Sequence, residues 1–421
     1  MTIFPTAALF VSLHLDFATL RDYSTFMYYT PVRADSYDQA NITLQIPKIV
    51  VYDPSQDPPI RAIDGVFTRN VAPIPLQPEL KVTDTALSFI HFDFDMAKSL
   101  HLDSQGQVTD SVTPIMTAFI VPKDAANSYG SFDNLVGFVS SVTPNPSGIF
   151  IGSFNLQIDS GTGQAIPISL TADTELSGVS DLNSLETGRV VEVMATVNDV
   201  GNIIAQKVQV EDRIDTTDNR IAFYGMVMPT PVRDTSGNVT QLKLFVRAMD
   251  PDESRTIPLN SVVTVNVSPE TVFSTSPQPD NLSALDFNPS SVAIGQELLV
   301  HGQYTAAVDQ PTLVDASSVY LRSQTLQGSL SSLVNVGSDG RTGAFWFSGC
   351  SGLLQTHPIM VMTSITNTDF INLFGLSELT SQSTLYVRGF PYYVKDATVI
   401  RGISVPAGTL VLFARVVRQV N

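Results

Sequence analysis

The chain has 421 residues and a formal net charge of −17, from 40 acidic and 23 basic side chains. Nucleic-acid binding through a basic surface needs clustered Lys and Arg, and an anionic membrane surface would repel this chain, so neither partner is expected. Apolar residues make up 43% of the chain, enough for several buried cores, and the charged share of 15% is low for a globular protein. A low charged share is common among secreted and cell-surface β proteins.

Membrane and disulfide features are limited in this sequence. No apolar run reaches the roughly 18 residues of a membrane-spanning helix, so none is expected. The single cysteine, Cys350, excludes a disulfide framework within the chain and is expected to be a small buried residue. The apolar segment 3–13 has no basic residue before it, so it fits a first strand better than a signal peptide. An export signal is therefore expected to lie outside this sequence.

Residues 1–122 are predicted to form a β-sandwich-like domain. The segment 40–52 alternates between apolar and polar residues and then becomes continuously apolar, as a half-buried strand does. Pro73, Pro75 and Pro78 mark an extended segment at the edge of a sheet, because proline cannot donate to a central ladder. Residues 112–121 are predicted to be the closing strand of this domain.

The segment 87–96 alternates strictly, which places His91, Asp93 and Asp95 on one face of a strand. Side chains two residues apart on a strand are about 7 Å apart, close enough for two of them to share a cation, and Ca²⁺ is the candidate because it prefers carboxylate oxygens. The competing interpretation is a solvated strand face. Asp199, Asp234 and Asp339 each precede a glycine in a polar turn, where they are expected to accept turn hydrogen bonds and not to bind metal.

After a polar linker at 122–133, three similar units are predicted at 134–213, 221–322 and 325–421. Each contains a β-hairpin, at 186–210, 295–321 and 383–405, and two further apolar strands follow the third hairpin and end near Val420. After each hairpin turn a small residue precedes a β-branched run; these residues are Ala205, Ala316 and Ala397. Internal repetition with irregular spacing indicates tandem domains with variable loops and not a solenoid.

Short strands with turn signals between them predict an all-β fold. A glycine-containing first strand and a final hairpin in about 100 residues suit a closed barrel of five or six strands, which also removes exposed sheet edges. The predicted architecture is an N-terminal β-sandwich-like domain followed by three tandem OB-like barrels.

Several motifs carry a resemblance to known families: LVGFVSSV at 135, TADTELSG at 171, TGRVVEVMATV at 187 and GNIIAQKVQV at 201, with VSPETVFS at 267, IGQELLVHGQY at 294 and ASSVYL at 316. They resemble an uncharacterised family of bacterial extracytoplasmic domains of unknown function, small OB-like barrels that occur in tandem. Residues 89–121 resemble the end of another β-rich envelope domain of unknown function. The resemblance implies export and an all-β fold, and it implies no catalytic residue.

Aromatic clusters are the candidate ligand-binding residues. OB-like barrels bind oligosaccharides and single strands on aromatic surfaces, and the negative charge makes a glycan the better candidate than nucleic acid. Alternating aromatic residues in strands more often belong to a core or an interface, so both interpretations stay open. The residues concerned are Phe345, Trp346, Phe347, Tyr392 and Tyr393.

The sequence therefore predicts a non-enzymatic structural protein, extracellular or at the cell surface. No Gly-x-Ser-x-Gly motif and no phosphate-binding loop occur, so no catalytic residue and no cofactor are expected. Self-association through β edges and apolar contacts is expected, with the segment 3–13 or the final strand at 408–420 adding to a neighbouring sheet. The alternative is a module of the cell envelope that binds a glycan through aromatic residues around Trp346.

Overall fold

The computed structural model describes residues 32–53, 55–56, 59–83, 88–123, 128–145, 148–157, 165–213, 220–229, 231–249, 257–275, 287–305, 313–349, 353–380 and 383–420. The chain divides into two compact units, Met1–Val210 and Glu211–Asn421. The apolar segment 3–13 lies outside the described residues. No helix within the described ranges is long and apolar enough to cross a membrane.

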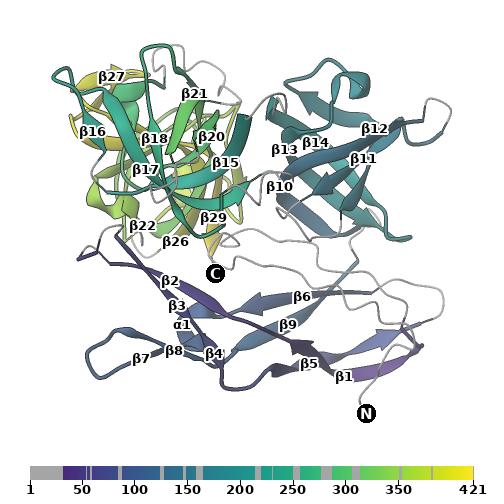
Figure 1. The fold of residues 1–421 in the computed structure, drawn as a ribbon. Coiled ribbons are helices and arrows are strands. Elements are labelled where there is room, and N and C mark those ends of the chain that lie inside the picture. Colours follow the sequence, from purple (N-terminus) through teal and green to yellow (C-terminus); the bar gives the residue numbers. More distant parts are fainter. Residues whose placement is uncertain are drawn as a thin grey trace. The chain divides into compact units, whose positions relative to one another are not determined.

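The N-terminal part of the first unit consists of small sheets (Figure 1). Two-stranded sheets are formed by β1 (Asp35–Thr43) with β5 (Val71–Val82), by β2 (Lys48–Tyr52) with β3 (Ile60–Asp64), and by β6 (Phe89–Phe94) with β9 (Met116–Val121). A three-stranded sheet has the strand order β4 (Val66–Phe67), β8 (Val108–Val112) and β7 (Leu100–Leu102). One short helix, α1 (Met96–Ser99), precedes β7.

Strand β5 supplies most of the buried apolar surface of these sheets. Ala72, Ile74 and Leu76 are buried, while the alternate residues Pro73 and Pro75 are exposed, as expected for a strand with one covered face. The buried face of β5 contacts β9. The prolines therefore lie on an edge strand, which confirms the prediction for this segment.

A closed five-stranded barrel, barrel 1, completes the first unit (Figure 1). Its strands pair in the order β10-β11-β12-β14-β13, so the first strand pairs with both the second and the fourth, and the third pairs in parallel with the fifth. A 3-10 helix, η1 (Leu182–Ser184), leads into the fourth strand. The strands are β10 (Ser128–Pro144), β11 (Gly152–Gln157), β12 (Ile166–Ser177), β13 (Arg189–Asn198) and β14 (Ile203–Arg213).

The described strands of the second unit form two further rings with this same strand order. Barrel 2 consists of β15 (Arg220–Val227), β17 (Val239–Met249), β18 (Val262–Asn266) continued by β19 (Val272–Thr275), β21 (Leu313–Leu321) and β20 (Glu297–Thr305), with the short β16 (Val232–Arg233) paired to β17. Barrel 3 consists of β22 (Gln324–Val336), β23 (Gly343–Ser348), β24 (Ile359–Thr363) continued by β25 (Asp369–Ile371), β29 (Thr409–Val420) and β26 (Thr384–Val394). The 3-10 helices η3 (Pro289–Ser291) and η5 (Leu376–Glu378) precede the fourth strands, and η4 (Leu353–Thr356) precedes β24.

This strand order is that of an OB-like barrel, so the predicted all-β class with tandem small OB-like barrels is confirmed. Each first strand carries a glycine where it bends to pair on both sides. A Cβ atom at Gly137 would overlap the carbonyl oxygen of Gln157, and one at Gly328 would overlap that of Ser348. Glycine is thus required there by the close approach of the neighbouring backbone.

A threonine hydroxyl, on a residue that is buried in barrels 2 and 3 and partly buried in barrel 1, fixes the third strand of each barrel to the fifth. The hydroxyl groups of Thr174, Thr271 and Thr368 donate to the carbonyl oxygens of Ala205, Ala316 and Ala414, at 2.7, 2.8 and 2.6 Å. Each hydroxyl also accepts a backbone N–H from the turn before it, at 2.9, 3.0 and 2.9 Å. We call this pair of bonds the threonine staple. The staple explains the similarity of the motifs TADTELSG at 171 and VSPETVFS at 267, because each contains the staple threonine and the turn before it.

The third hairpin was predicted at the wrong place. The partner of β26 is β29, so Ala414 and not Ala397 is the counterpart of Ala205 and Ala316. Residues 398–405 form a separate small hairpin of β27 (Thr398–Ile400) and β28 (Ile403–Val405), with positive φ at Arg401 and Gly402 in its turn. Three-residue strands cannot pair along the eleven residues of β26, whereas β29 can.

The first barrel begins before the predicted boundary at 134. Strand β10 starts at Ser128, and its first residues pair with β13, with Ser128 opposite Asn198 and Phe132 opposite Ala195. Backbone pairing builds this part of the strand, so its small polar residues gave no alternating pattern and resembled a linker. Residues 214–219, between the first two predicted units, lie outside the described residues.

Barrels 2 and 3 share one hydrophobic core. The buried cluster that fills barrel 2, around Phe223 and Leu244, continues into Met360, Phe390 and Tyr392 of barrel 3. A second cluster, including Phe345, Val361 and Leu412, fills the interior of barrel 3. Strand β24 is buried along its whole length, since one face meets each cluster. Barrel 1 has its own core around Phe154, Ile168 and Val193.

Candidate functional site

The three predicted metal ligands do not converge. His91 stacks on Phe119, with ring centroids 4.5 Å apart, and burial lowers the pKa of its imidazole. Asp95 lies beyond the end of β6, where it caps α1: its carboxylate accepts the backbone N–H of Lys98 and forms an ion pair with that side chain at 2.7 Å. Among the described residues no group of three or more His, Cys, Asp or Glu side chains could hold a metal ion.

The acidic turn residues behave as predicted at two positions. Backbone N–H groups of Asn238 and Ser236 bind the Asp234 carboxylate, and these hydrogen bonds lower its pKa. Asp339 is bound in the same way by Thr342 and Arg341, which lowers its pKa too. In the third turn the neighbouring Asn198 accepts the turn bonds, and Asp199 instead lies 3.4 Å from the Lys123 ammonium.

The predicted aromatic ligand site is a core and an interface. Phe345, Phe347 and Tyr392 are buried, and Trp346 packs against the core shared by barrels 2 and 3. Tyr393 lies against the interior cluster of barrel 3, with its ring 5.0 Å from that of His357. Strand alternation sends neighbouring residues to opposite faces, so Phe345 and Phe347 lie in the interior of barrel 3 while the partly buried Trp346 packs on its other side. The burial of Phe345, Phe347 and Tyr392 favours the interpretation as a core and an interface over that as a glycan platform. Cys350 lies outside the described residues.

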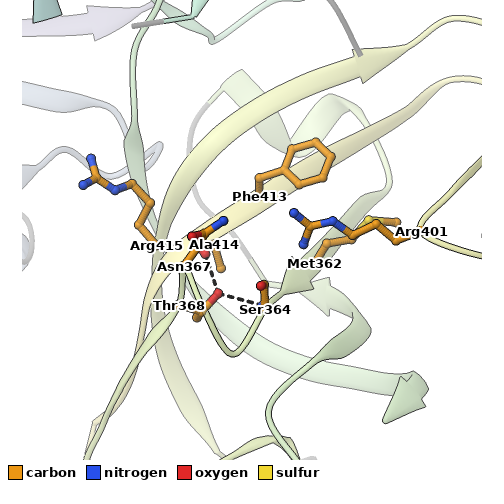
Figure 2. A pocket seen from close by; sticks show the side chains of 8 residues that line it. All are labelled: Met362, Ser364, Asn367, Thr368, Arg401, Phe413, Ala414 and Arg415. Carbon is orange, nitrogen blue, oxygen red and sulfur yellow. Dashed lines mark hydrogen bonds between the residues drawn. The ribbon is translucent and has the colours of Figure 1, made fainter. Parts of the chain in front are cut away.

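One small, mostly apolar pocket lies on barrel 3 beside a threonine staple (Figure 2). Its volume of about 20 Å³ is enough for about one water molecule. Thr368, which makes the staple bond to the Ala414 carbonyl oxygen, is one of the lining residues. The Arg401 guanidinium lies 5.9 Å from the centre of the Phe413 ring, and its partial burial lowers its pKa. Figure 2 shows the Arg415 side chain pointing away from Arg401, so the two cations do not converge on one ligand. The pocket is lined by Met362, Ser364, Asn367, Thr368, Arg401, Phe413, Ala414 and Arg415.

The outer edge of β1 is the candidate functional site. Among the described strands β1 pairs with β5 alone, in antiparallel register (Figure 1). Gln39 lies opposite Pro75, and Asn41 lies opposite Pro73. Residues opposite each other in an antiparallel pair alternate between hydrogen-bonded and non-hydrogen-bonded pairs, and a hydrogen-bonded pair needs an N–H from both residues. Because proline has no N–H, both of these pairs are of the non-hydrogen-bonded kind.

A second observation fixes the same alternation. The Leu44 N–H donates to the carbonyl oxygen of Asn70 at 2.8 Å, one step beyond the pair of Thr43 with Val71. Hydrogen-bonded pairs therefore fall on the even-numbered residues of this part of β1. The N–H and C=O groups of Gln39, Asn41 and Thr43 point away from β5.

The two edges of this sheet are consequently different. On the outer edge of β5, the two residues whose N–H groups would point outward are Pro73 and Pro75, which have no N–H. On the outer edge of β1 both donors and acceptors are present at Gln39 and Asn41. The segments proposed from sequence for edge pairing were others. The final strand, β29, pairs with β26 on one side and with β24 and β25 on the other, so that proposal was wrong. The alternating spacing of Pro73 and Pro75 is visible in the sequence, but it indicates which backbone groups of β1 point outward only when the register of β1 with β5 is known.

Residues 136–209 match a family model described as "Domain of unknown function (DUF5666)". The match spans barrel 1 from β10 to β14 and confirms the expected likeness to a domain family of unknown function. A comparison with curated proteins gave no match. Among solved structures, the chain is similar to a deletion mutant of the single-stranded DNA binding protein from Thermus aquaticus, with 14% identity and a TM-score of 0.15, over 47% of this chain and 96% of that chain. A TM-score this low supports no inference about function.

Proposed function

We propose that this chain is a non-enzymatic structural protein, at the cell surface or in a secreted assembly, whose copies join through the outer edge of β1. The observation that supports the proposal is the contrast between the two edges of one sheet: proline blocks the outer edge of β5, while β1 keeps its outward N–H and C=O groups at Gln39 and Asn41. A sheet edge with outward N–H and C=O groups is a template on which another chain can add a strand.

A second copy of this chain is the proposed partner. Two β1 strands can pair antiparallel across a two-fold axis, which is the commonest symmetry of soluble oligomers. With Gln39 opposite Asn41 of the second copy, both residues use outward-facing backbone groups, and a four-stranded sheet results. This register places Asp38 opposite Ile42 of the second copy and so avoids a direct pair of carboxylates. The low share of charged residues supports an extracellular location.

The test is sedimentation velocity of the full chain over a range of concentrations, with negative-stain electron microscopy of the same samples. Asn41→Pro removes an outward N–H but no bond to β5, whereas Asn41→Ala removes the side chain and keeps that N–H. We expect the wild type and Asn41→Ala to associate and Asn41→Pro to stay monomeric with an unchanged circular dichroism spectrum. Association of Asn41→Pro at the wild-type concentration, or a monomeric wild type at every concentration, would overturn the proposal.

The blocked edge provides a test in the opposite direction. Replacing both Pro73 and Pro75 with threonine restores two outward N–H groups on β5. A sheet with two open edges can grow at both, so this double variant is expected to form larger species than the wild type. If it sediments like the wild type, the prolines do not block an edge that matters for association.

A further inference from the structure

The three barrels place a corresponding residue at the entrance to the fourth strand. Ser180 lies two residues before η1, Phe287 two residues before η3, and Phe374 two residues before η5. The same spacing separates Ser180 from Gly188 and Phe287 from Gly295, the glycines with positive φ that open the fourth strands. These three residues are therefore counterparts in one repeated fold.

In barrel 2 this position is the contact with the next barrel. Phe287 is 3% exposed, and its ring meets that of Tyr392 of barrel 3 edge-on, with centroids 6.3 Å apart. Two hydrogen bonds lie on either side of it. The hydroxyls of Thr275 and Tyr392 are 2.7 Å apart, and the Gln296 side chain donates to the carbonyl oxygen of Pro391 at 2.6 Å. Phe287 and the residues around it thus form part of the contact between barrels 2 and 3.

The counterparts in the other barrels differ in chemistry. In barrel 1 the position is the exposed Ser180, whose hydroxyl pairs with that of Ser184 at 2.9 Å. In barrel 3 it is Phe374, which is 87% exposed. The backbone of this loop is held in place, because the Phe374 N–H donates to the Glu378 carboxylate at 2.9 Å. An exposed phenylalanine at the position where barrel 2 contacts barrel 3 indicates a contact surface on barrel 3 as well.

We propose that the Phe374 loop of barrel 3 docks on a barrel of a second copy of this chain, with Phe374 buried as Phe287 is buried in barrel 2. The occupant follows from the internal repeat, since the corresponding loop of barrel 2 is covered by a barrel of this same chain. The inference rests on the proposed assembly role and adds a second contact to it. Pairing of two β1 edges closes into a dimer, whereas a loop that binds a different surface is heterologous and extends dimers into larger assemblies.

The test compares Phe374→Ser with Ile149→Ser, a control that removes a similarly exposed apolar side chain (89%) from barrel 1. We expect Phe374→Ser to raise the dissociation constant of the larger assemblies at least about tenfold, as loss of an aromatic anchor does, and Phe374→Tyr to keep them. Sedimentation velocity measures the species, and the fluorescence of Trp346 checks that barrel 3 stays folded. Assemblies of Phe374→Ser equal to those of Ile149→Ser would overturn the inference.

The two contacts fail in distinguishable ways. Loss of Phe374 alone is expected to leave dimers held by β1, whereas Asn41→Pro, which lacks the dimer that the Phe374 contact extends, is expected to stay monomeric. If Asn41→Pro abolishes all association and Phe374→Ser changes nothing, the β1 proposal stands and the Phe374 inference is wrong. If Phe374→Ser abolishes all association and Asn41→Pro changes nothing, the opposite holds.

Discussion

Removal of one hydroxyl from each threonine staple tests how these barrels are held together. Thr368→Val and Thr271→Val keep the branched shape of the side chain but leave two backbone groups without a partner, the Ala carbonyl and the turn N–H. Both hydroxyls are in buried surroundings, so water cannot replace them. An unsatisfied buried polar group costs about 1–3 kcal/mol, and we expect about 2–3 kcal/mol for each of these variants. Thr174 is only partly buried, so Thr174→Val is expected to cost about 1 kcal/mol.

The single tryptophan makes the second unit visible by itself. Trp346 lies in barrel 3 and packs against the core that barrels 2 and 3 share. Its fluorescence during urea unfolding therefore reports on Glu211–Asn421. With a slope of about 2 kcal/mol per molar urea, a loss of 2 kcal/mol lowers the midpoint by about 1 M. Thr271→Val and Thr368→Val are expected to lower this midpoint, and Thr174→Val, in the other unit, is expected to leave it unchanged.

Two results would refute this reasoning. An unchanged midpoint in Thr368→Val would show that the hydroxyl contributes no net free energy despite its two short hydrogen bonds. A shift in Thr174→Val as large as that in Thr271→Val would show that the tryptophan does not report on the second unit alone. The control is Thr368→Ser, which keeps the hydroxyl and loses only the methyl group, so it is expected to keep both staple bonds and to lower the midpoint less than Thr368→Val does.

Three further predictions use the same fluorescence. Gln296→Leu removes three hydrogen bonds, one of them to Pro391, and is expected to lower the stability of the second unit by about 3 kcal/mol, while Gln303→Leu on the exposed face of β20 leaves it unchanged within about 0.5 kcal/mol. Burial and the nearby Arg233 guanidinium lower the pKa of His357, so the imidazole binds a proton more readily in the unfolded chain than in the folded one. The stability of the second unit is therefore expected to fall as the pH drops below about 6.5, the usual pKa of histidine. His357→Gln is expected to reduce the difference between the urea midpoints at pH 7.5 and pH 5.5. Gly389→Ala would place a Cβ atom against the carbonyl oxygen of Phe413, so a midpoint equal to that of the wild type would contradict the tight pairing of β26 with β29.

Repetition was the part of the fold that the sequence predicted best. The glycine-led hairpins at 186–210 and 295–321 are the fourth and fifth strands of barrels 1 and 2, and the threonine motifs at 171 and 267 mark their staples. The third repeat was displaced because residues 398–405 have the composition of a returning strand. Only the length of the partner strand, which pattern alone does not give, selects β29 instead.

The candidate sites were harder to predict, for two physical reasons. Strict alternation through Asp95 suggested one strand face, but its carboxylate starts a helix, and a helix cap and a strand residue have the same composition. The β1 edge was missed because the direction of a backbone N–H depends on register. Pro73 and Pro75 fix that register only once their partners on β1 are known.

The aromatic residues around Trp346 show why composition could not separate a ligand platform from a domain contact. Strands β23 and β24 of barrel 3 are covered on both faces, on one face by the interior of the barrel and on the other by barrel 2. Phe345 and Trp346, although adjacent in sequence, therefore pack against different cores. A sequence in which apolar residues occupy both faces of a strand is compatible with a packed neighbour or with a binding surface. The position before the 3-10 helix distinguishes the two, because the repeat supplies its own comparison. Phe287 shows what covers such a loop within one chain, and Phe374 presents the same side chain with that cover absent from the described residues of barrel 3.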